Sequence, residues 1–202
     1  SAAINVSGTT TLTAGSANDI QLDAANDFGG AVSITSGRNV TLNDIHAIDL
    51  GASTISGSLT VTANGAITDS GALNVTNTTS LSAGSANDIT LDDAANELSQ
   101  IVIPSGRNVV LRDSSGLKFV DGASTISGNL AVTTNSEISQ EVSPFKAVGW
   151  LDVTGTTTFD AGSANSINLP GPGNNFRGPV LITAANDVAL NDAGDIDLGA
   201  ST

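Results

Sequence analysis

Cysteine, methionine and tyrosine are absent from this chain, and tryptophan and histidine occur only once each. Without cysteine the fold contains no disulfide, and no thiol is present to act as a nucleophile or a metal ligand. A chain free of cysteine is compatible with export from a bacterial cell, although it does not require it.

Basic residues are scarce as well. Six Lys and Arg stand against 20 Asp and Glu, which gives a formal net charge of -14. No basic stripe is available to neutralise phosphates, so we expect neither nucleic acid nor an anionic membrane surface as a partner. No apolar run approaches the length that spans a bilayer, so we expect no membrane insertion. The acidic excess either keeps the chain soluble or binds cations through carboxylates.

Helical periodicity is also missing, because no segment of useful length has apolar residues at helical spacing. Aromatic residues make up only 3% of the chain, so its apolar interior must come mainly from Val, Ile, Leu and Ala. Such side chains suit narrow, regular layers. The 22 glycines, with abundant Thr, Ser, Asn and Asp, are typical of β-strands and turns. We therefore predict an all-β fold.

Repetition is the main feature of this sequence. AGSAND at residues 14–19 returns at 83–88 and, as AGSANS, at 161–166, so the copies are offset by 69 and then 78 residues. Self-similarity at a long period indicates a repeat architecture. We treat residues 1–202 as one solenoid segment. Its long repeats cover about residues 1–72, 73–150 and 151–202, the last of them incomplete.

Apolar residues within each repeat lie two positions apart. Ile20 and Leu22 flank one polar residue, and Val40 and Leu42 flank another. Period two places each pair on one face of a short strand. About nine strands per repeat divide into three coils of roughly 23 residues, with three strands each, so about nine coils form a parallel β-helix. An antiparallel sandwich is the competing interpretation, but it requires no repeat of this kind.

Matching residues mark the corners between the predicted strands. Asparagine tolerates left-handed backbone and caps its own turn, and stacked asparagines bond to neighbouring coils. One apolar residue follows the second asparagine in each copy, and we expect it to close the core at the corner. The two asparagine positions are Asn18, Asn87 and Asn165, and Asn26, Asn96 and Asn174; the apolar position is Phe28, Leu98 and Phe176.

Two segments depart from the repeat. Seven residues are inserted within QEVSPFKAVGW at residues 140–150, which contains the only tryptophan. Insertions in solenoids emerge as loops that often bind ligands, although a flap over a corner of the core is the simpler interpretation. The candidate binding residues are Pro144, Phe145, Lys146 and Trp150. The second departure, PGPGNNFRGP at residues 170–179, is rich in proline and predicts a protruding loop.

No pattern in the chain predicts catalysis. A nucleophilic triad normally needs a histidine, and the single His46 is replaced by Gly194 in the third repeat. Repeating carboxylates indicate a structural ladder along the rod rather than a singular acid and base pair. The repeating charged residues are Asp19, Asp23, Asp88 and Asp92, together with Arg38 and Arg107, which we expect at exposed strand ends.

We therefore predict no enzyme, no catalytic residue, no cofactor and no dedicated metal ligand. Calcium is the alternative, because aligned carboxylates and carbonyls bind hard cations. The calcium-binding nonapeptide GGxGxDxUx and the loop DxDxDG are both absent from the chain.

The strings GTTTLTAGSANDIQLDAANDFGGAVSITSGRNVTLND and AIDLGASTISGSLTVTANGAITDSGALNVT resemble the repeat shafts of very large bacterial exoproteins. These are the filamentous-haemagglutinin-like adhesins, which are often exported by two-partner secretion. The likeness covers essentially the whole chain. It implies a right-handed parallel β-helix at the bacterial cell surface or in the extracellular medium, and it transfers no functional residue.

The leading hypothesis is a structural segment of an extended extracellular or cell-surface shaft or filament, belonging to an adhesin or matrix protein. Its expected partners are further repeats of the same protein or head-to-tail copies, with host or matrix glycans as candidate ligands. A self-contained calcium- or glycan-binding module is the alternative. A polysaccharide-active enzyme comes third.

Overall fold

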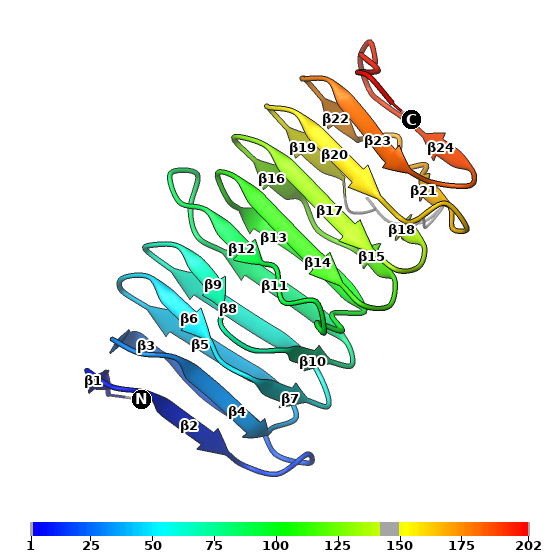
Figure 1. Cartoon of the computed structure of the whole chain (residues 1–202). Coiled ribbons are helices and arrows are strands. Elements are labelled where there is room, and N and C mark those ends of the chain that lie inside the picture. The colour runs from blue at the N-terminus through cyan, green and yellow to red at the C-terminus, as the bar shows by residue number, and fades with distance from the viewer. Residues whose placement is uncertain (1, 142–149, 202) are drawn as a thin grey trace.

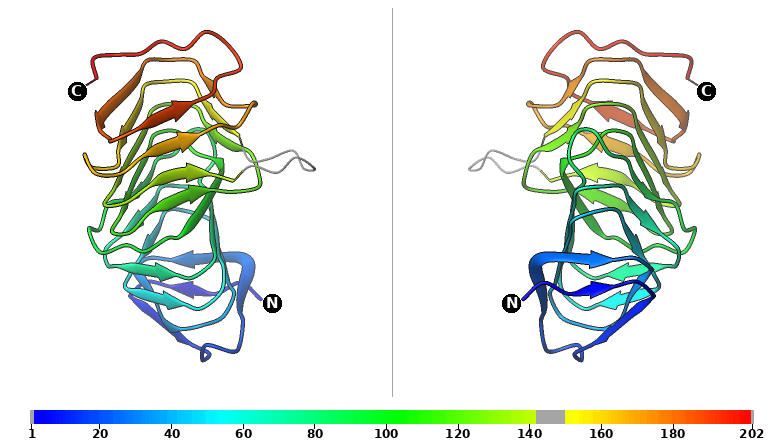
Figure 2. Two further views of the ribbon diagram at one scale, coloured as in Figure 1. Left: turned by 90° about the vertical axis from the view of Figure 1, so that its right-hand side faces the viewer. Right: turned by 90° about the vertical axis from the view of Figure 1, so that its left-hand side faces the viewer.

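The computed structural model describes residues 2–141 and 150–201, and the regular secondary structure there consists of β-strands. The strands stack in parallel from one end of the molecule to the other, with the two ends of the chain at opposite ends of the stack (Figures 1 and 2). The chain forms a right-handed parallel β-helix of about 8 turns, with coils of ~21 residues. The predicted architecture is confirmed, although the coils are slightly fewer and shorter than the nine coils of 23 residues expected. No helix in the described part of the chain is long and apolar enough to cross a membrane.

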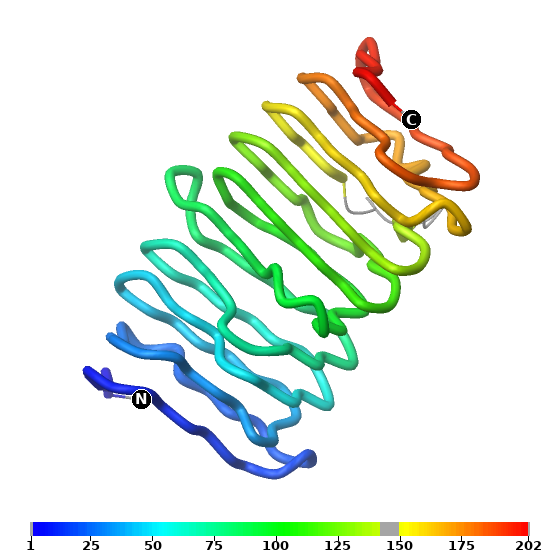
Figure 3. Tube along the Cα trace, viewed as in Figure 1, coloured from blue at the N-terminus to red at the C-terminus, as the bar shows by residue number. Residues whose placement is uncertain are grey.

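Two long sheets run along the stack, whose successive coils Figure 3 traces one beside the next. Successive strands in each sheet belong to successive coils, as when Val40 pairs with Leu59. The ten-stranded sheet contains β1 (Asn5–Val6), β3 (Ile20–Phe28), β5 (Val40–Asp44), β8 (Leu59–Ala63), β11 (Thr78–Ser82), β13 (Gln100–Ser105), β15 (Leu117–Phe119), β18 (Ile138–Gln140), β21 (Ile167–Leu169) and β24 (Val188–Leu190). The nine-stranded sheet contains β2 (Thr10–Thr13), β4 (Val32–Ser36), β6 (Ile48–Leu50), β9 (Ile67–Asp69), β12 (Ile89–Leu91), β14 (Val109–Asp113), β17 (Leu130–Thr134), β20 (Thr157–Asp160) and β23 (Val180–Ala184).

The remaining strands form two separate short sheets rather than a continuous third sheet, which explains why three full strands per coil are not observed. One short sheet pairs β7 (Ser53–Ile55) with β10 (Leu73–Val75). Another contains β16 (Ser124–Ile126), β19 (Leu151–Val153) and β22 (Asn175–Phe176). In the first, the chain passes from the nine-stranded to the ten-stranded sheet, whereas in the second it passes in the opposite direction. The two short sheets therefore lie on opposite edges of the solenoid.

This change of edge follows from the length of the repeat. The strands β2, β11 and β20 hold equivalent residues of the three copies, yet β2 and β20 lie in the nine-stranded sheet and β11 in the ten-stranded one. Between β2 and β11 the chain passes through seven strands of the two long sheets, including β2. Two such strands complete a coil, so the 69-residue repeat spans three and a half coils. Each copy is rotated by half a turn relative to the one before it.

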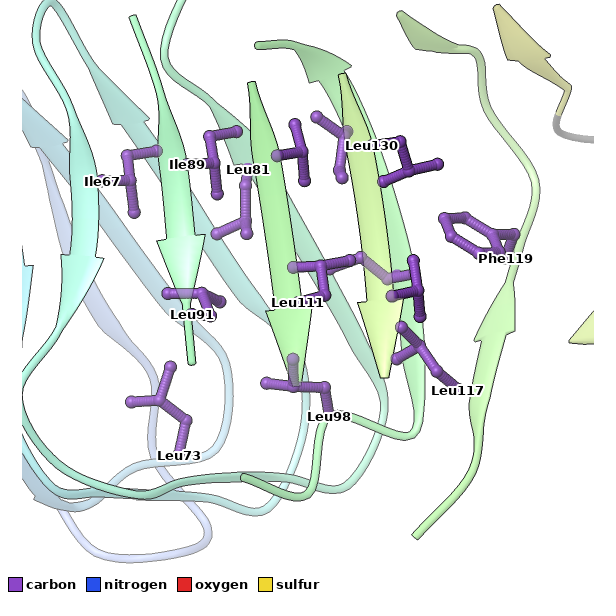
Figure 4. Packing of buried hydrophobic residues seen from close by; sticks show 14 of the residues in the cluster. Ile67, Leu73, Leu81, Ile89, Leu91, Leu98, Leu111, Leu117, Phe119 and Leu130 are labelled. Atoms are coloured by element: carbon purple, nitrogen blue, oxygen red, sulfur yellow. The ribbon is translucent and has the colours of Figure 1, made fainter. Parts of the chain in front are cut away.

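The core is a single continuous column of aliphatic side chains, shown in part in Figure 4. The pairs spaced two apart point inward: Val40 and Leu42 are buried, as are their neighbours Leu59 and Val61 in the next coil. The expected corner residues Phe28, Leu98 and Phe176 are also buried, and the ring of Phe176 packs edge-to-face on Phe159 with centroids 6.3 Å apart. The predicted inward assignment is confirmed for these pairs, whereas Ile20 and Leu22 pack against the core but are only partly buried, and Ile4 is 38% exposed.

The corner asparagines are tied to backbone rather than to one another. Asn26 is fully buried; its Oδ1 accepts a hydrogen bond of 3.0 Å from Ile4 N of the preceding coil, and its Nδ2 donates to Asn43 O of the following coil. Asn96 and Asn174 accept in the same way from Leu73 N and Leu151 N. Since successive copies lie on opposite edges, equivalent asparagines do not stack. Each one instead bonds to backbone of its own neighbouring coils.

The AGSAN corner depends on its glycine. Gly15, Gly84 and Gly162 have φ of 86°, 77° and 75°, a left-handed conformation that side chains with a Cβ disfavour. The asparagine three residues later closes the turn, as Asn87 Nδ2 donates to Ala83 O at 2.8 Å. Because backbone conformation and cap recur together in all three copies, AGSAN is a structural corner.

Candidate functional site

The four residues predicted for a binding loop are divided by what the structure covers. Pro144, Phe145 and Lys146 lie outside the described residues. Trp150 is described, and 41% of its surface is exposed, which is unusual in a chain whose core aromatic residues are buried. It directly precedes β19, on the face formed by β16, β19 and β22.

Alternation along β19 decides which side chains face outward. Leu151 and Val153 are fully buried, so Trp150 and Asp152 point to the solvent side of the same strand. The neighbouring strand contributes Asn175, which pairs with Asp152 in the sheet register. Trp150 and Asp152 therefore share one outer surface with residues that lie more than twenty positions further along the chain.

The polar part of this surface is a closed network. Arg177 binds Asp152 through two hydrogen bonds of 3.0 Å each, from Nε to Oδ1 and from Nη2 to Oδ2. Asn175 Nδ2 donates to Asp152 Oδ1 at 3.2 Å. The hydrogen bonds to Asp152 raise the pKa of Arg177 above its ordinary value, so its guanidinium is charged at any physiological pH. The ion pair leaves this patch close to neutral, within a strongly acidic chain.

Trp150 is held in place by contacts of both its backbone and its side chain. Its carbonyl oxygen accepts a 2.8 Å hydrogen bond from Ser124 N of the preceding coil. Its side chain lies over Gly173, where an added Cβ would lie 3.3 Å from Trp150 Cβ and 3.6 Å from Cγ and Cε3. Below, the buried Gln140 donates to Asn174 Oδ1 at 2.7 Å and accepts from Gly171 N at 2.8 Å. The proline-rich loop is thus fixed to the coil beneath it.

The tryptophan and the arginine both depart from the repeat. Trp150 occupies the position of Ala3 and Ala72, whereas Arg177 occupies that of Gly29 and Ser99. The amide–carboxylate pair between them is common to the three copies, because Asn5 bonds to Asp27 and Asn74 to Glu97. Asn175 and Asp152 form the third such pair. The third copy therefore adds an aromatic ring and a cation to a structural pair that already exists.

The repeating arginines are exposed, as predicted, and each one also forms an ion pair with an aspartate. Arg38 binds Asp19 of the preceding coil with a 2.8 Å bond from Nε, and Arg107 binds Asp88 in the same way. The arginine side chain and the backbone N–H of the next residue hold the pKa of Asp19 and Asp88 well below the ordinary value. The two pairs lie on opposite edges because of the half-turn, so they form no continuous ladder.

A histidine–carboxylate cluster lies at another corner. One ligand atom each from Asp27, Asp44 and His46 lie within 4.8 Å of one another. The buried Asp44 already accepts hydrogen bonds from Phe28 N and His46 N, at 2.8 Å and 2.7 Å. His46 Nδ1 lies 3.1 Å from Asp27 Oδ1. These bonds account for the cluster as a corner cap.

Aspartates equivalent to Asp44 cap the same corner in the other copies. Asp113 accepts from Leu98 N at 2.6 Å and from Ser115 N at 2.8 Å, and Asp192 accepts from Phe176 N at 3.1 Å. Sequence reasoning missed these caps. The signal for them was available, since all three aspartates follow the same apolar strand pattern in each repeat.

Fold and surface together define a repeat protein of the β-solenoid class. A family model described as repeats of unknown function (DUF5649) matches residues 1–35, 37–105 and 106–183. The chain belongs to this family. No curated protein and no solved structure matches the chain.

Proposed function

We propose that this chain is a structural segment of an extended shaft or filament, located outside the cell or on its surface. The observation that carries the proposal is the half-turn repeat. Each long repeat, offset by 69 or 78 residues from the next, advances the stack by three and a half coils and continues the same two long sheets. A longer array of such units lengthens the rod without limit and without a new kind of contact.

Each coil buries apolar residues of the coil beside it. Ile196 and Leu198 are 41% and 62% exposed, whereas the equivalent Ile48 and Leu50 are buried by the coil that follows them. Val188 and Val40 differ in the same way. We propose further repeats, in the same polypeptide or in a head-to-tail copy, as partners, because successive coils within the described stack pair through the same two sheets.

The charge distribution supports a thin rod over a lateral bundle. The net charge of -14 disfavours side-by-side association at low salt. The extracellular location, and membership of a filamentous-haemagglutinin-like adhesin or matrix protein, rest on the sequence resemblance and on the absence of cysteine. We propose no catalytic role.

Small-angle scattering and electron microscopy test this proposal. We expect rods whose length grows with protein concentration, and long thin fibres in native material. Leu198→Asp places a charge on the end face and should shorten the rods, whereas Val110→Asp changes an apolar residue on the lateral surface and should leave the length unchanged. Discrete globular particles of constant size would contradict the shaft.

A further inference from the structure

We infer that the outer face of β16, β19 and β22 binds a neutral saccharide, which stacks on Trp150 and bonds to Asp152, Asn175 and Arg177. This inference deepens the proposed shaft function by naming what one face of the shaft recognises. The residues involved lie within the described part of the chain.

Two residues that depart from the repeat lie together on this face. Trp150 and Arg177 come from different segments of the chain, and each replaces a small residue found in the other copies. The sheet register brings the two segments together, since Asp152 pairs with Asn175 and Val153 with Phe176. A repeat needs neither residue for its core, because the same coil forms around Ala72 and Ser99. Two departures from the repeat therefore meet on one surface, which is what a binding site added to a structural repeat would produce.

The surface combines an aromatic platform with hydrogen-bonding groups, which suits a sugar ring. An indole ring provides a large, flat apolar platform at little cost in conformational entropy, suited to the C–H face of a pyranose ring. Residues two apart on a strand lie about 6.5–7 Å apart, which places the polar groups beside the ring at roughly the width of one sugar unit. Arginine has further N–H donors beyond the two that bind Asp152, and these are available for hydroxyl groups.

The side chains of this surface are held in place by their own contacts. The Trp150 ring rests against Gly173, and the loop below it is held through Gln140 and Asn174. Asp152 is fixed by two bonds from Arg177 and one from Asn175. The surface is therefore organised before a ligand arrives, which lowers the entropic cost of binding.

The charge of the protein favours neutral saccharides over anionic ones. Arg177 is neutralised by Asp152, and the rest of the chain is acidic, with a net charge of -14. A sulfated or carboxylated glycan would meet net repulsion. A neutral glycan meets none, so we commit to a neutral ligand.

The simpler alternative is that Trp150 only covers the loop at Gly173. Trp150→Ala distinguishes the two roles, because alanine is the natural residue at this position in both other copies. Arg177→Ser restores the residue at Ser99 in the same manner. Both variants should therefore fold. Val110→Ala removes an exposed apolar side chain from the nine-stranded sheet and is the matched control.

The emission of Trp150 reports binding directly, because the chain has no other tryptophan and no tyrosine. We would titrate the full chain with cellohexaose, chitohexaose and mannohexaose, and with heparin as the polyanionic probe. Calorimetry with the same probes covers Trp150→Ala. Circular dichroism melting curves of all variants verify folding.

We expect a saturable emission change with at least one neutral oligosaccharide and none with heparin. Arg177→Ser should weaken binding by about tenfold or more, since it removes a charged hydrogen-bond donor. Trp150→Ala should abolish the heat of binding without lowering the melting temperature, and Val110→Ala should bind normally. No saturable change with any neutral probe, or equal binding by Trp150→Ala, would overturn the inference. Either result leaves the shaft proposal standing, because that proposal is tested by rod length.

Discussion

Buried positions in this solenoid tolerate few substitutions, because each core side chain packs against the neighbouring coils. Leu91 in β12 is fully buried, and Thr90 beside it faces outward. Leu91→Asp should cost several kcal/mol, since it buries an unpaired charge. Thr90→Asp on the opposite face of the same strand should cost far less. Denaturant unfolding measures both, and equal stability of the two variants would refute the inward assignment of this strand.

The capping aspartates stabilise the fold by accepting hydrogen bonds from buried backbone groups. Asp113 is buried and accepts from Leu98 N and from both the backbone and the hydroxyl of Ser115. Asp113→Ala leaves these donors unsatisfied and should destabilise the fold by about 2–4 kcal/mol. Asp113→Asn keeps one acceptor and should cost less. Glu137→Ala removes an exposed acid and serves as the control; a similar loss in that variant would show that the cap is not the cause.

Between coils, the exposed ion pairs make stability depend on pH. The pKa of Asp88 is depressed in the folded chain by hydrogen bonds from Arg107 and from Asn108 N. A depressed folded pKa stabilises above the unfolded value of about 3.9, and the contribution is lost as the pH falls toward the folded pKa. The stability difference between the native chain and Arg107→Ala should be present near neutral pH and shrink below about pH 4. A difference that stays constant down to about pH 2 would argue against this ion pair.

Element by element, sequence reasoning recovered what is local. The alternation of Val40 with Leu42 needs no knowledge of the rest of the fold, and it predicted inward-facing strands correctly. The sequence did not predict how each copy of the repeat is rotated relative to the next. Corner lengths vary, so residues per coil cannot be read from a repeat of 69, and the half-turn between copies appears only when strands are paired.

The candidate site shows the same division. Trp150 was predicted as part of a binding loop because it is unique and lies at an insertion. Arg177 was not predicted, because its approach to Asp152 depends on the register of β19 with β22 across a segment of altered length. Spatial coincidence of distant exceptions cannot be seen in one sequence without that register.

In the molecule as a whole, we expect the core and the corners to supply the stability, rather than metal ions. Asp19 and Asp88 are committed to arginines, and Asp44 and Asp113 to backbone donors. Chelation with EDTA should therefore lower the melting temperature only slightly. A drop of tens of degrees that calcium reverses would instead favour the calcium-binding module.

The half-turn between copies can be tested directly by measuring the distance between two equivalent corners. The chain has no cysteine, so Ser16→Cys with Ser85→Cys places spin labels at two equivalent, exposed corner positions. Three and a half coils advance the chain by about 17 Å along the axis. The predicted arrangement puts the labels on opposite edges, so their measured electron–electron distance should clearly exceed that advance by the width of the solenoid. A distance close to about 17 Å would place both corners on one edge and contradict the account.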